Sequence, residues 1–184
     1  MDDIVKQALA KWPNVPDCYG WLALDGRGRW FLRDMDTQAC GPFPCSKGSL
    51  LQHEKLMGFI GRNYDVDARG CWFFQNGPQR VYVELEETPI VWRVDEDGSV
   101  HSHIGESVTA QRCLVDEQGR VYLVADGVFG LVHTQDVMRM ALCIEAAHWV
   151  PEEVHSSDLE SHYGFVRSPE KLVAQTTEGK NGVA

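Results

Sequence analysis

Four short turn sequences, each flanked by runs of aromatic and aliphatic residues, constrain the fold of this chain more than any other feature. Three have the form Asp-x-x-Gly, at residues 25–28, 95–98 and 116–119, and the fourth is Gln75-Asn76-Gly77-Pro78-Gln79. Asp and Asn bond to nearby backbone groups and Gly adopts positive φ, so these sequences favour tight turns. They predict four β-hairpins, with strands at residues 19–24 and 29–32, 71–74 and 81–85, 90–94 and 99–104, and 112–115 and 120–125.

The second hairpin carries a regular alternation of side chains. Apolar residues at positions 81, 83 and 85 alternate with Tyr82, Glu84 and Glu86. Successive strand residues face opposite sides of a sheet, so we expect the apolar set to face the core and the other set to face solvent.

Helical spacing of apolar residues predicts an N-terminal helix over residues 4–12, which ends at Pro13. Residues 34–48 contain several Gly and Pro residues without a sustained period, which indicates a surface loop.

Two amphipathic helices follow in the sequence. The first begins with the capping-box pair Ser49 and Gln52 and ends at Asn63. The second begins at Thr134, a suitable N-cap, and ends before Pro151. Antiparallel hairpins together with two amphipathic helices indicate an α+β fold.

An internal similarity bears on the domain organisation. Residues 21–32 and 113–123 share Leu, Asp, Gly-Arg and an aromatic residue in nearby register. Either a hairpin-helix unit is duplicated, so that two copies bury each other's apolar faces, or Asp-x-x-Gly is simply common turn chemistry. With duplication we expect an N-terminal helix and linker at 1–18, a first unit with central hairpins at 19–110, a second unit at 111–165 and a polar, flexible tail at 166–184.

Composition excludes several functional classes. The 184 residues carry 17 Lys and Arg against 27 Asp and Glu, a net charge of −10, and 43% are hydrophobic. This hydrophobic content excludes a disordered chain, and the negative charge disfavours partners such as nucleic acid or an anionic membrane. The start of the sequence lacks a secretory pattern, so we expect a cytoplasmic protein whose six cysteines are free thiols.

Motifs for hydrolase, nucleotide-binding and zincin chemistry are absent, and no residue is assigned a catalytic role. Cys40, Cys45 and His53 could supply three metal ligands from a Pro-rich loop, but no fourth ligand is evident. His101 and His103 project from one strand face and could chelate a metal, although two solvated histidines are the simpler interpretation. We expect no cofactor.

Aromatic residues concentrate on the predicted hairpins. Neighbouring residues face opposite sides of a strand, so some aromatic surface must lie outside a single core. Packing against a helix would bury it; alternatively, Trp72, Phe74, Tyr82 and Trp92 would bind a ligand or a partner.

Several short segments within residues 20–150 resemble proteobacterial families of unknown function. They are residues 71–74, 81–91, 119–123 and 127–132, and Lys11 to Pro16 with Tyr19 to Trp21 is similar to the opening of one such family. The resemblance implies an α+β fold with repeated hairpin-helix motifs and a ligand-binding or signalling-associated role. It supplies no catalytic residues.

These observations lead to a functional hypothesis. We expect a non-enzymatic binding module for a small molecule or a protein partner, in signalling or regulation, and a homo-oligomer is compatible with the sequence. The alternative is a thiol- or metal-dependent enzyme that uses a Cys/His site.

Overall fold

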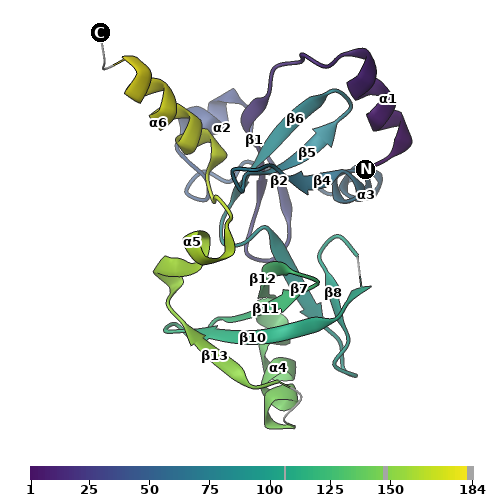
Figure 1. The fold of residues 1–184 in the computed structure, drawn as a ribbon, viewed down its shortest axis with the longest axis vertical. Coiled ribbons are helices and arrows are strands. Elements are labelled where there is room, and N and C mark those ends of the chain that lie inside the picture. The colour runs from purple at the N-terminus through teal and green to yellow at the C-terminus, as the bar shows by residue number, and fades with distance from the viewer. Residues whose placement is uncertain (106, 147–148, 182–184) are drawn as a thin grey trace. The chain divides into compact units, whose positions relative to one another are not determined.

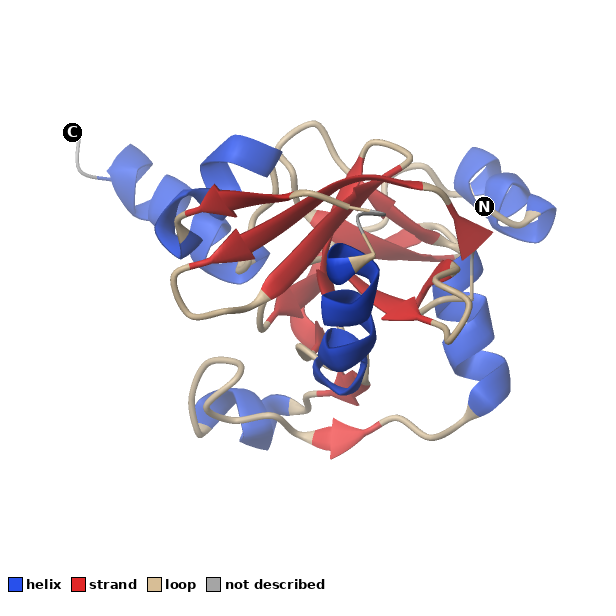
Figure 2. Cartoon of the chain, turned by 90° about the horizontal axis from the view of Figure 1, so that it is seen from below, coloured by secondary structure: helices blue, strands red, loops and turns tan. Residues whose placement is uncertain are grey.

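The computed structural model describes residues 1–105, 107–146 and 149–181. Within these residues it contains two β-sheets and six α-helices, which confirms the α+β class (Figure 2). The chain divides into two compact units. Unit 1 comprises Met1–Leu24, Trp30–Glu86 and the chain from Val166 onward, and unit 2 comprises Asp25–Arg29 and Glu87–Phe165. None of the described helices is long and apolar enough to cross a membrane.

Unit 1 is built on a six-stranded sheet with the strand order β3-β2-β1-β6-β5-β4. The central neighbours β1 and β6 are parallel, and the other neighbouring pairs are antiparallel. The elements of this unit are α1 (Asp3–Lys11), β1 (Cys18–Leu24), β2 (Trp30–Leu32), α2 (Met35–Ala39), β3 (Ser49–Leu50), α3 (Glu54–Arg62), β4 (Tyr64–Val66), β5 (Trp72–Asn76), β6 (Gln79–Leu85) and α6 (Pro169–Asn181).

Helices contact both faces of this sheet. On one face, Phe59 of α3 meets Phe74 of β5 edge to face, with ring centroids 5.4 Å apart. On the other, α6 lies against β1 and β6 (Figure 1), and its Leu172 packs against the buried aromatic cluster around Tyr82. Phe74 pairs with Val81 and Phe73 pairs with Tyr82, which places the two contacts on opposite faces.

The exposure predicted for Tyr82 and Glu84 is therefore wrong. These residues are only 1% and 3% exposed. The Glu84 carboxylate accepts hydrogen bonds from the Ser168 hydroxyl at 2.5 Å and from the Glu170 backbone N–H at 3.1 Å. Burial raises the pKa of Glu84, and these hydrogen bonds offset part of that effect. Residues 166–184, expected as a flexible tail, thus include α6, which is held on the sheet because Glu84 and Ser168 satisfy donors at its N-terminus.

The first predicted amphipathic helix begins later than expected. Ser49 pairs with Leu32 in the ladder between β2 and β3, so it is not a helix cap. The His53 ring caps α3 instead, by accepting a hydrogen bond from the Leu56 backbone N–H at 3.2 Å. Part of the expected loop forms α2, whose N-cap is Asp34.

Unit 2 is built on a seven-stranded sheet with the order β13-β10-β11-β12-β7-β8-β9. Its elements are β7 (Ile90–Val94), β8 (Val100–Ser102), β9 (Ser107–Val108), β10 (Ala110–Asp116), β11 (Val121–Ala125), β12 (Val128–Val132), the 3-10 helix η1 (Thr134–Asp136), α4 (Val137–Glu145), β13 (Pro151–Val154), the 3-10 helix η2 (Ser156–Asp158) and α5 (Leu159–Tyr163). The N-cap of η1 is His133 rather than Thr134, and α4 follows η1 directly.

The two sheets share one connectivity. β7 to β12 follow the order of β1 to β6, with β7 and β12 parallel at the centre as β1 and β6 are. In this order the hairpin β1–β2 corresponds to β7–β8, and β4–β5 corresponds to β10–β11. The similarity noted in the sequence instead aligned residues 21–32, which belong to β1–β2, with residues 113–123, which belong to β10–β11. Between the second and fourth strands, unit 1 carries α2, β3 and α3, whereas the described residues of unit 2 carry only β9 there. The two helices of this segment distinguish unit 1 from unit 2.

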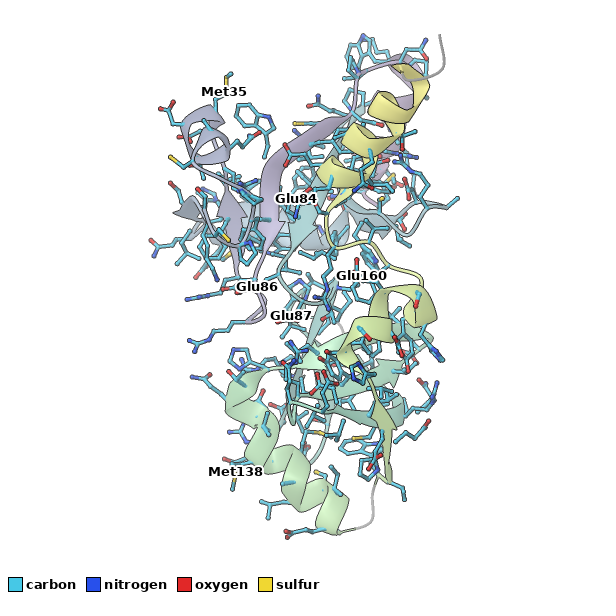
Figure 3. All side chains as sticks on the ribbon, turned by 90° about the vertical axis from the view of Figure 1, so that its left-hand side faces the viewer. Met35, Glu84, Glu86, Glu87, Met138 and Glu160 are labelled. Carbon is cyan, nitrogen blue, oxygen red and sulfur yellow. The ribbon has the colours of Figure 1, made fainter. Side chains whose placement is uncertain are left out.

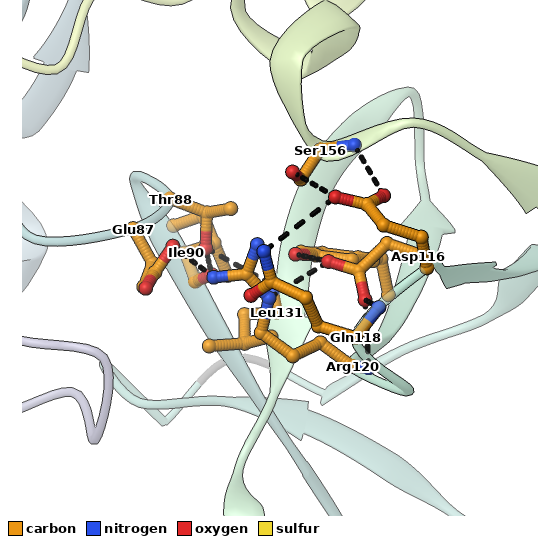
Figure 4. Close-up of polar contacts among 10 residues, drawn as sticks. Glu87, Thr88, Ile90, Asp116, Gln118, Arg120, Leu131 and Ser156 are labelled. Carbon is orange, nitrogen blue, oxygen red and sulfur yellow. Dashed lines mark hydrogen bonds and ion pairs between the residues drawn. The ribbon is translucent and has the colours of Figure 1, made fainter.

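The predicted turns form as expected. Gly28, Gly98 and Gly119 each have positive φ, and each backbone N–H donates to the carbonyl of the Asp three residues earlier at 3.0 Å. In the turn between β10 and β11, the buried Asp116 accepts hydrogen bonds from the Arg120 backbone and guanidinium and from the Tyr122 hydroxyl (Figure 4). The turn aspartate therefore fixes the strand that follows it.

Candidate ligand-binding cavity

Unit 1 contains a cavity of about 430 Å³, here called the α3 cavity, between α3 and the sheet. Its walls are apolar side chains from four strands and the helix, with three polar residues among them. They are Trp21, Leu22, Leu32, Leu56, Ile60, Phe74 and Val81, with Arg33, Asp34 and Asn76.

Strand register explains why four of these side chains, those of Leu22, Leu32, Phe74 and Val81, share one sheet face. Leu22 of β1 lies opposite Leu32 of β2 and beside Val83 of β6. Phe74 of β5 lies opposite Val81 of β6, two positions before Val83 on the same face. Period-two alternation therefore gathers these four strand residues on one face without any local sequence motif, whereas Trp21, next to Leu22 in β1, is not placed by it.

The helix supplies the facing wall. Leu56 and Ile60 lie four residues apart in α3, so they occupy one side of the helix. Ile60 is only 2% exposed, whereas Leu56 is half-buried. The helix thus closes the inner end of the cavity and leaves the other end open.

The mouth of the cavity carries exposed apolar side chains. Trp21 and Leu32 are 44% and 45% exposed, although both line the cavity, and Met35 in the neighbouring α2 is 72% exposed. Figure 3 shows Met35 projecting from α2. By contrast, Leu22 and Phe74 are buried. A buried apolar floor beneath an exposed apolar mouth is typical of ligand sites.

The charged residues at the cavity are engaged elsewhere. The Arg33 guanidinium donates to the backbone carbonyls of Gly20, Gly41 and Ser46. None of these three residues lines the cavity. Asp34 accepts from the backbone N–H of the third residue of α2 at 2.9 Å, and this hydrogen bond lowers its pKa. The α3 cavity therefore suits an uncharged apolar molecule better than an ion.

The four aromatic residues predicted to bind a ligand do not form one site. Tyr82 lies on the opposite sheet face, stacked on Tyr19 with centroids 4.6 Å apart. Trp72 is half-buried and packs against Tyr64. Of the four, Phe74 alone lines the α3 cavity.

The remaining aromatic candidate belongs to unit 2. Trp92 is 2% exposed, and its indole Nε1–H donates to the Leu123 carbonyl at 3.0 Å. It is a core residue with a satisfied polar group.

The predicted metal ligands occupy separate structural positions. Cys40 and Cys45 are exposed, and His53 caps α3. In unit 2, His101 Nδ1 lies 3.2 Å from a carboxylate oxygen of Asp95, and His103 Nδ1 accepts a hydrogen bond from a strand N–H. Across residues 1–105, 107–146 and 149–181, no group of three or more His, Cys, Asp or Glu residues is arranged to hold a metal ion.

Two buried thiols are poor nucleophiles. Burial raises the pKa of Cys71 and of Cys113 to about 11, with nearby carboxylates adding to the effect. Neither cysteine lines the α3 cavity. At neutral pH both are therefore almost entirely in the unreactive thiol form.

Sequence reasoning did not single out Trp21, Leu32, Leu56 or Ile60 as site residues. Trp21 and Leu32 look like ordinary strand residues, and Leu56 and Ile60 look like an ordinary helix stripe. The strand-to-helix distance that opens the cavity has no signature in the sequence.

Comparison with known proteins identifies a family without an assigned activity. Residues 1–170 match the family described as "Protein of unknown function (DUF2946)". The chain belongs to this family. No curated protein matches it.

Two solved structures are similar to parts of the chain. A DUF1285 family protein from Silicibacter pomeroyi DSS-3 is 15% identical, with 72% of this chain and 73% of that chain covered and a TM-score of 0.48. A DUF1285 family protein from Shewanella baltica OS155 is 14% identical, with 66% of this chain and 91% of that chain covered and a TM-score of 0.46. These likenesses are too distant to inform the function.

Proposed function

We propose that this protein is a cytoplasmic, non-enzymatic binding module that holds a small, uncharged, apolar molecule in the α3 cavity, with a role in signalling or regulation. The observation that carries the proposal is the cavity itself, about 430 Å³ in volume with apolar walls and an open mouth. Ligand pockets of globular proteins have volumes of roughly 300–1,000 Å³ and walls of this kind.

The shared strand order supports a role for this segment beyond folding. Unit 2 builds its sheet with the same connectivity, but the part of the chain that the structure describes between its second and fourth strands has no helix. The sheet architecture thus does not require α2 and α3. In unit 1, α3 forms the wall that carries Leu56 and Ile60.

The polar residues of the cavity restrict the chemistry of the ligand. Asn76 offers an amide that can donate or accept, and Asp34 offers a carboxylate. An anionic ligand would meet the Asp34 charge, while a neutral hydroxyl or amide group could bond to either side chain. The favoured ligand has an apolar body and at most one neutral polar group.

Binding of the neutral fluorescent probe N-phenyl-1-naphthylamine tests this proposal. We expect saturable binding to the full chain with one site per molecule, seen as an increase in probe emission. Val81→Trp places a larger side chain inside the cavity and should weaken binding at least tenfold. Val66→Trp is the matched control, since Val66 is 41% exposed on the edge strand β4 and lies outside the cavity.

The result that would refute the proposal is equal probe affinity in Val81→Trp and in the unmodified protein, with both proteins folded by circular dichroism. Failure of the probe to saturate would refute it as well. Unchanged binding in Val66→Trp is required for the interpretation.

A further inference from the structure

Helix α4 presents an apolar stripe to solvent. Met138 is 75% exposed and Leu142 is 64% exposed, and Ala146 follows at the C-cap, also exposed. These three residues are spaced four apart, so they lie along one side of the helix. Figure 3 shows Met138 projecting outward from α4. Exposed large apolar side chains in a row are characteristic of a protein interaction surface.

The orientation of this stripe is fixed by other contacts of the helix. Met140 is fully buried. Arg139 donates to the Asp136 carboxylate at 2.8 Å and to the Val94 carbonyl at 3.1 Å. Asp136 also accepts two hydrogen bonds from the Arg93 guanidinium. The helix therefore cannot rotate to bury Leu142 without breaking these contacts.

An acidic turn lies beside the stripe. Asp95, Glu96 and Asp97 line a hollow of about 290 Å³ together with Leu142 and Ala146. Gly98 ends this turn with a positive φ, a conformation that disfavours residues with a side chain, and no side chain enters the hollow from this position. The hollow thus combines an apolar floor with a negative rim.

The basic side chains near this rim already have acidic partners. Arg139 also lines the hollow, but its guanidinium is paired with the buried Asp136. The His101 imidazole lies 3.2 Å from Asp95. Asp97 accepts a hydrogen bond from the Ser99 backbone N–H and keeps its negative charge. Glu96 is exposed at the tip of the turn.

We propose that this surface binds a cationic amphipathic helix of a partner protein. The apolar side of that helix packs on Met138, Leu142 and Ala146. A Lys or Arg side chain enters the hollow, with its methylene groups on Leu142 and its charge at the acidic turn. A second copy of this chain is a poor partner, because each copy carries a net charge of −10. The proposal is independent of the α3 cavity.

A synthetic peptide provides the test. The probe is a fluorescein-labelled 18-residue helix with Leu on one side and Lys on the other, and its twin carries Glu in place of Lys. We expect the full chain to bind the Lys peptide, measured by fluorescence anisotropy, and to bind the Glu peptide at least tenfold more weakly. Added salt should weaken the Lys complex.

Matched variants distinguish binding at this surface from non-specific attraction of a cationic peptide to an acidic protein. Leu142→Asp and Glu96→Lys should each weaken binding of the Lys peptide at least fivefold. The controls Ile4→Asp, at a position 71% exposed on α1, and Asp3→Lys, at a side chain 88% exposed, make the same chemical changes elsewhere and should leave affinity within twofold.

Equal losses in the test and control variants would overturn the proposal, because they would indicate non-specific charge attraction. Equal affinity for the Lys and Glu peptides would overturn the cationic assignment. Phosphatidylcholine vesicles test the other class of partner. If the chain binds these vesicles and Leu142→Asp abolishes the binding, the stripe binds a lipid surface and the proposal of a protein partner is overturned.

Discussion

Replacing Asp116 with alanine should destabilise unit 2 by about 4 kcal/mol, because its fully buried carboxylate satisfies both the partly exposed Arg120 and a buried hydroxyl; removing one partner of a buried ion pair costs ~3–5 kcal/mol. Asp116 is 5% exposed, and its carboxylate accepts from the Arg120 guanidinium at 2.7 Å and from the Tyr122 hydroxyl at 2.8 Å. It also accepts from the backbone N–H groups of Gln118 and Arg120. Alanine would leave the hydroxyl of the fully buried Tyr122 without its acceptor.

Amide hydrogen exchange across the hairpin of β10 and β11 measures this effect. A loss of about 4 kcal/mol corresponds to roughly a thousandfold faster exchange, at 1.36 kcal/mol per factor of ten, where exchange follows unfolding of unit 2. The control is Asp97→Ala, at an exposed aspartate in the turn between β7 and β8, whose carboxylate holds one backbone N–H at 2.9 Å. It should change exchange little. Equal protection in the two variants would refute the reasoning.

The contribution of Asp116 should also depend on pH. Burial alone would raise the pKa of this carboxyl, but hydrogen bonds from Arg120, Tyr122 and Gln118 outweigh burial and lower it. A lowered pKa in the folded state stabilises the protein above the unfolded-state value, near 4, and this stabilisation is lost as pH falls below it. The difference between the native protein and Asp116→Ala should therefore shrink below about pH 4.

Two further substitutions test packing and burial. Gly130→Ala places a Cβ 2.6 Å from both the Ile90 carbonyl oxygen and Trp92 Nε1, so it should destabilise unit 2 by about 3 kcal/mol and expose the Trp92 indole; an unchanged urea midpoint and tryptophan emission would contradict this. Glu84→Gln should match or exceed the native protein in stability at pH 7, because burial raises the folded-state pKa of Glu84 and makes its ionisation unfavourable to folding as pH rises. That advantage should vanish below about pH 4, where the carboxyl is neutral in both states. Urea unfolding of both proteins at pH 7 and pH 4 measures the difference in stability. A variant clearly less stable than the native protein at pH 7 would contradict the prediction and show that the ionised carboxylate stabilises the docked α6.

Local turn sequences made the hairpins of this fold predictable from the sequence. The aspartates and glycines of the turns act within four residues of each other, so Gly28, Gly98 and Gly119 marked hairpins that the structure confirms. The N-terminal helix was also evident, since its apolar spacing and Pro13 are both local signals.

Burial of a residue by a segment far away in the sequence could not be predicted in the same way. Tyr82 and Glu84 look solvent-exposed by alternation, but α6, more than 80 residues further on, buries them. Ser49 satisfies a capping pattern, yet pairing with Leu32 decides its conformation. The α3 cavity depends on how Leu56 and Ile60 stand above the sheet, which is a tertiary distance.

The division of the chain into units has a consequence for how the protein could be split. Unit 1 takes its last helix from beyond Val166, and unit 2 takes residues 25–29 from the first hairpin. A cut between Glu86 and Glu87 would thus yield two polypeptides, each lacking a piece that only the other contains. Neither half is an independent domain, and each would serve as the complement of the other in reassembly.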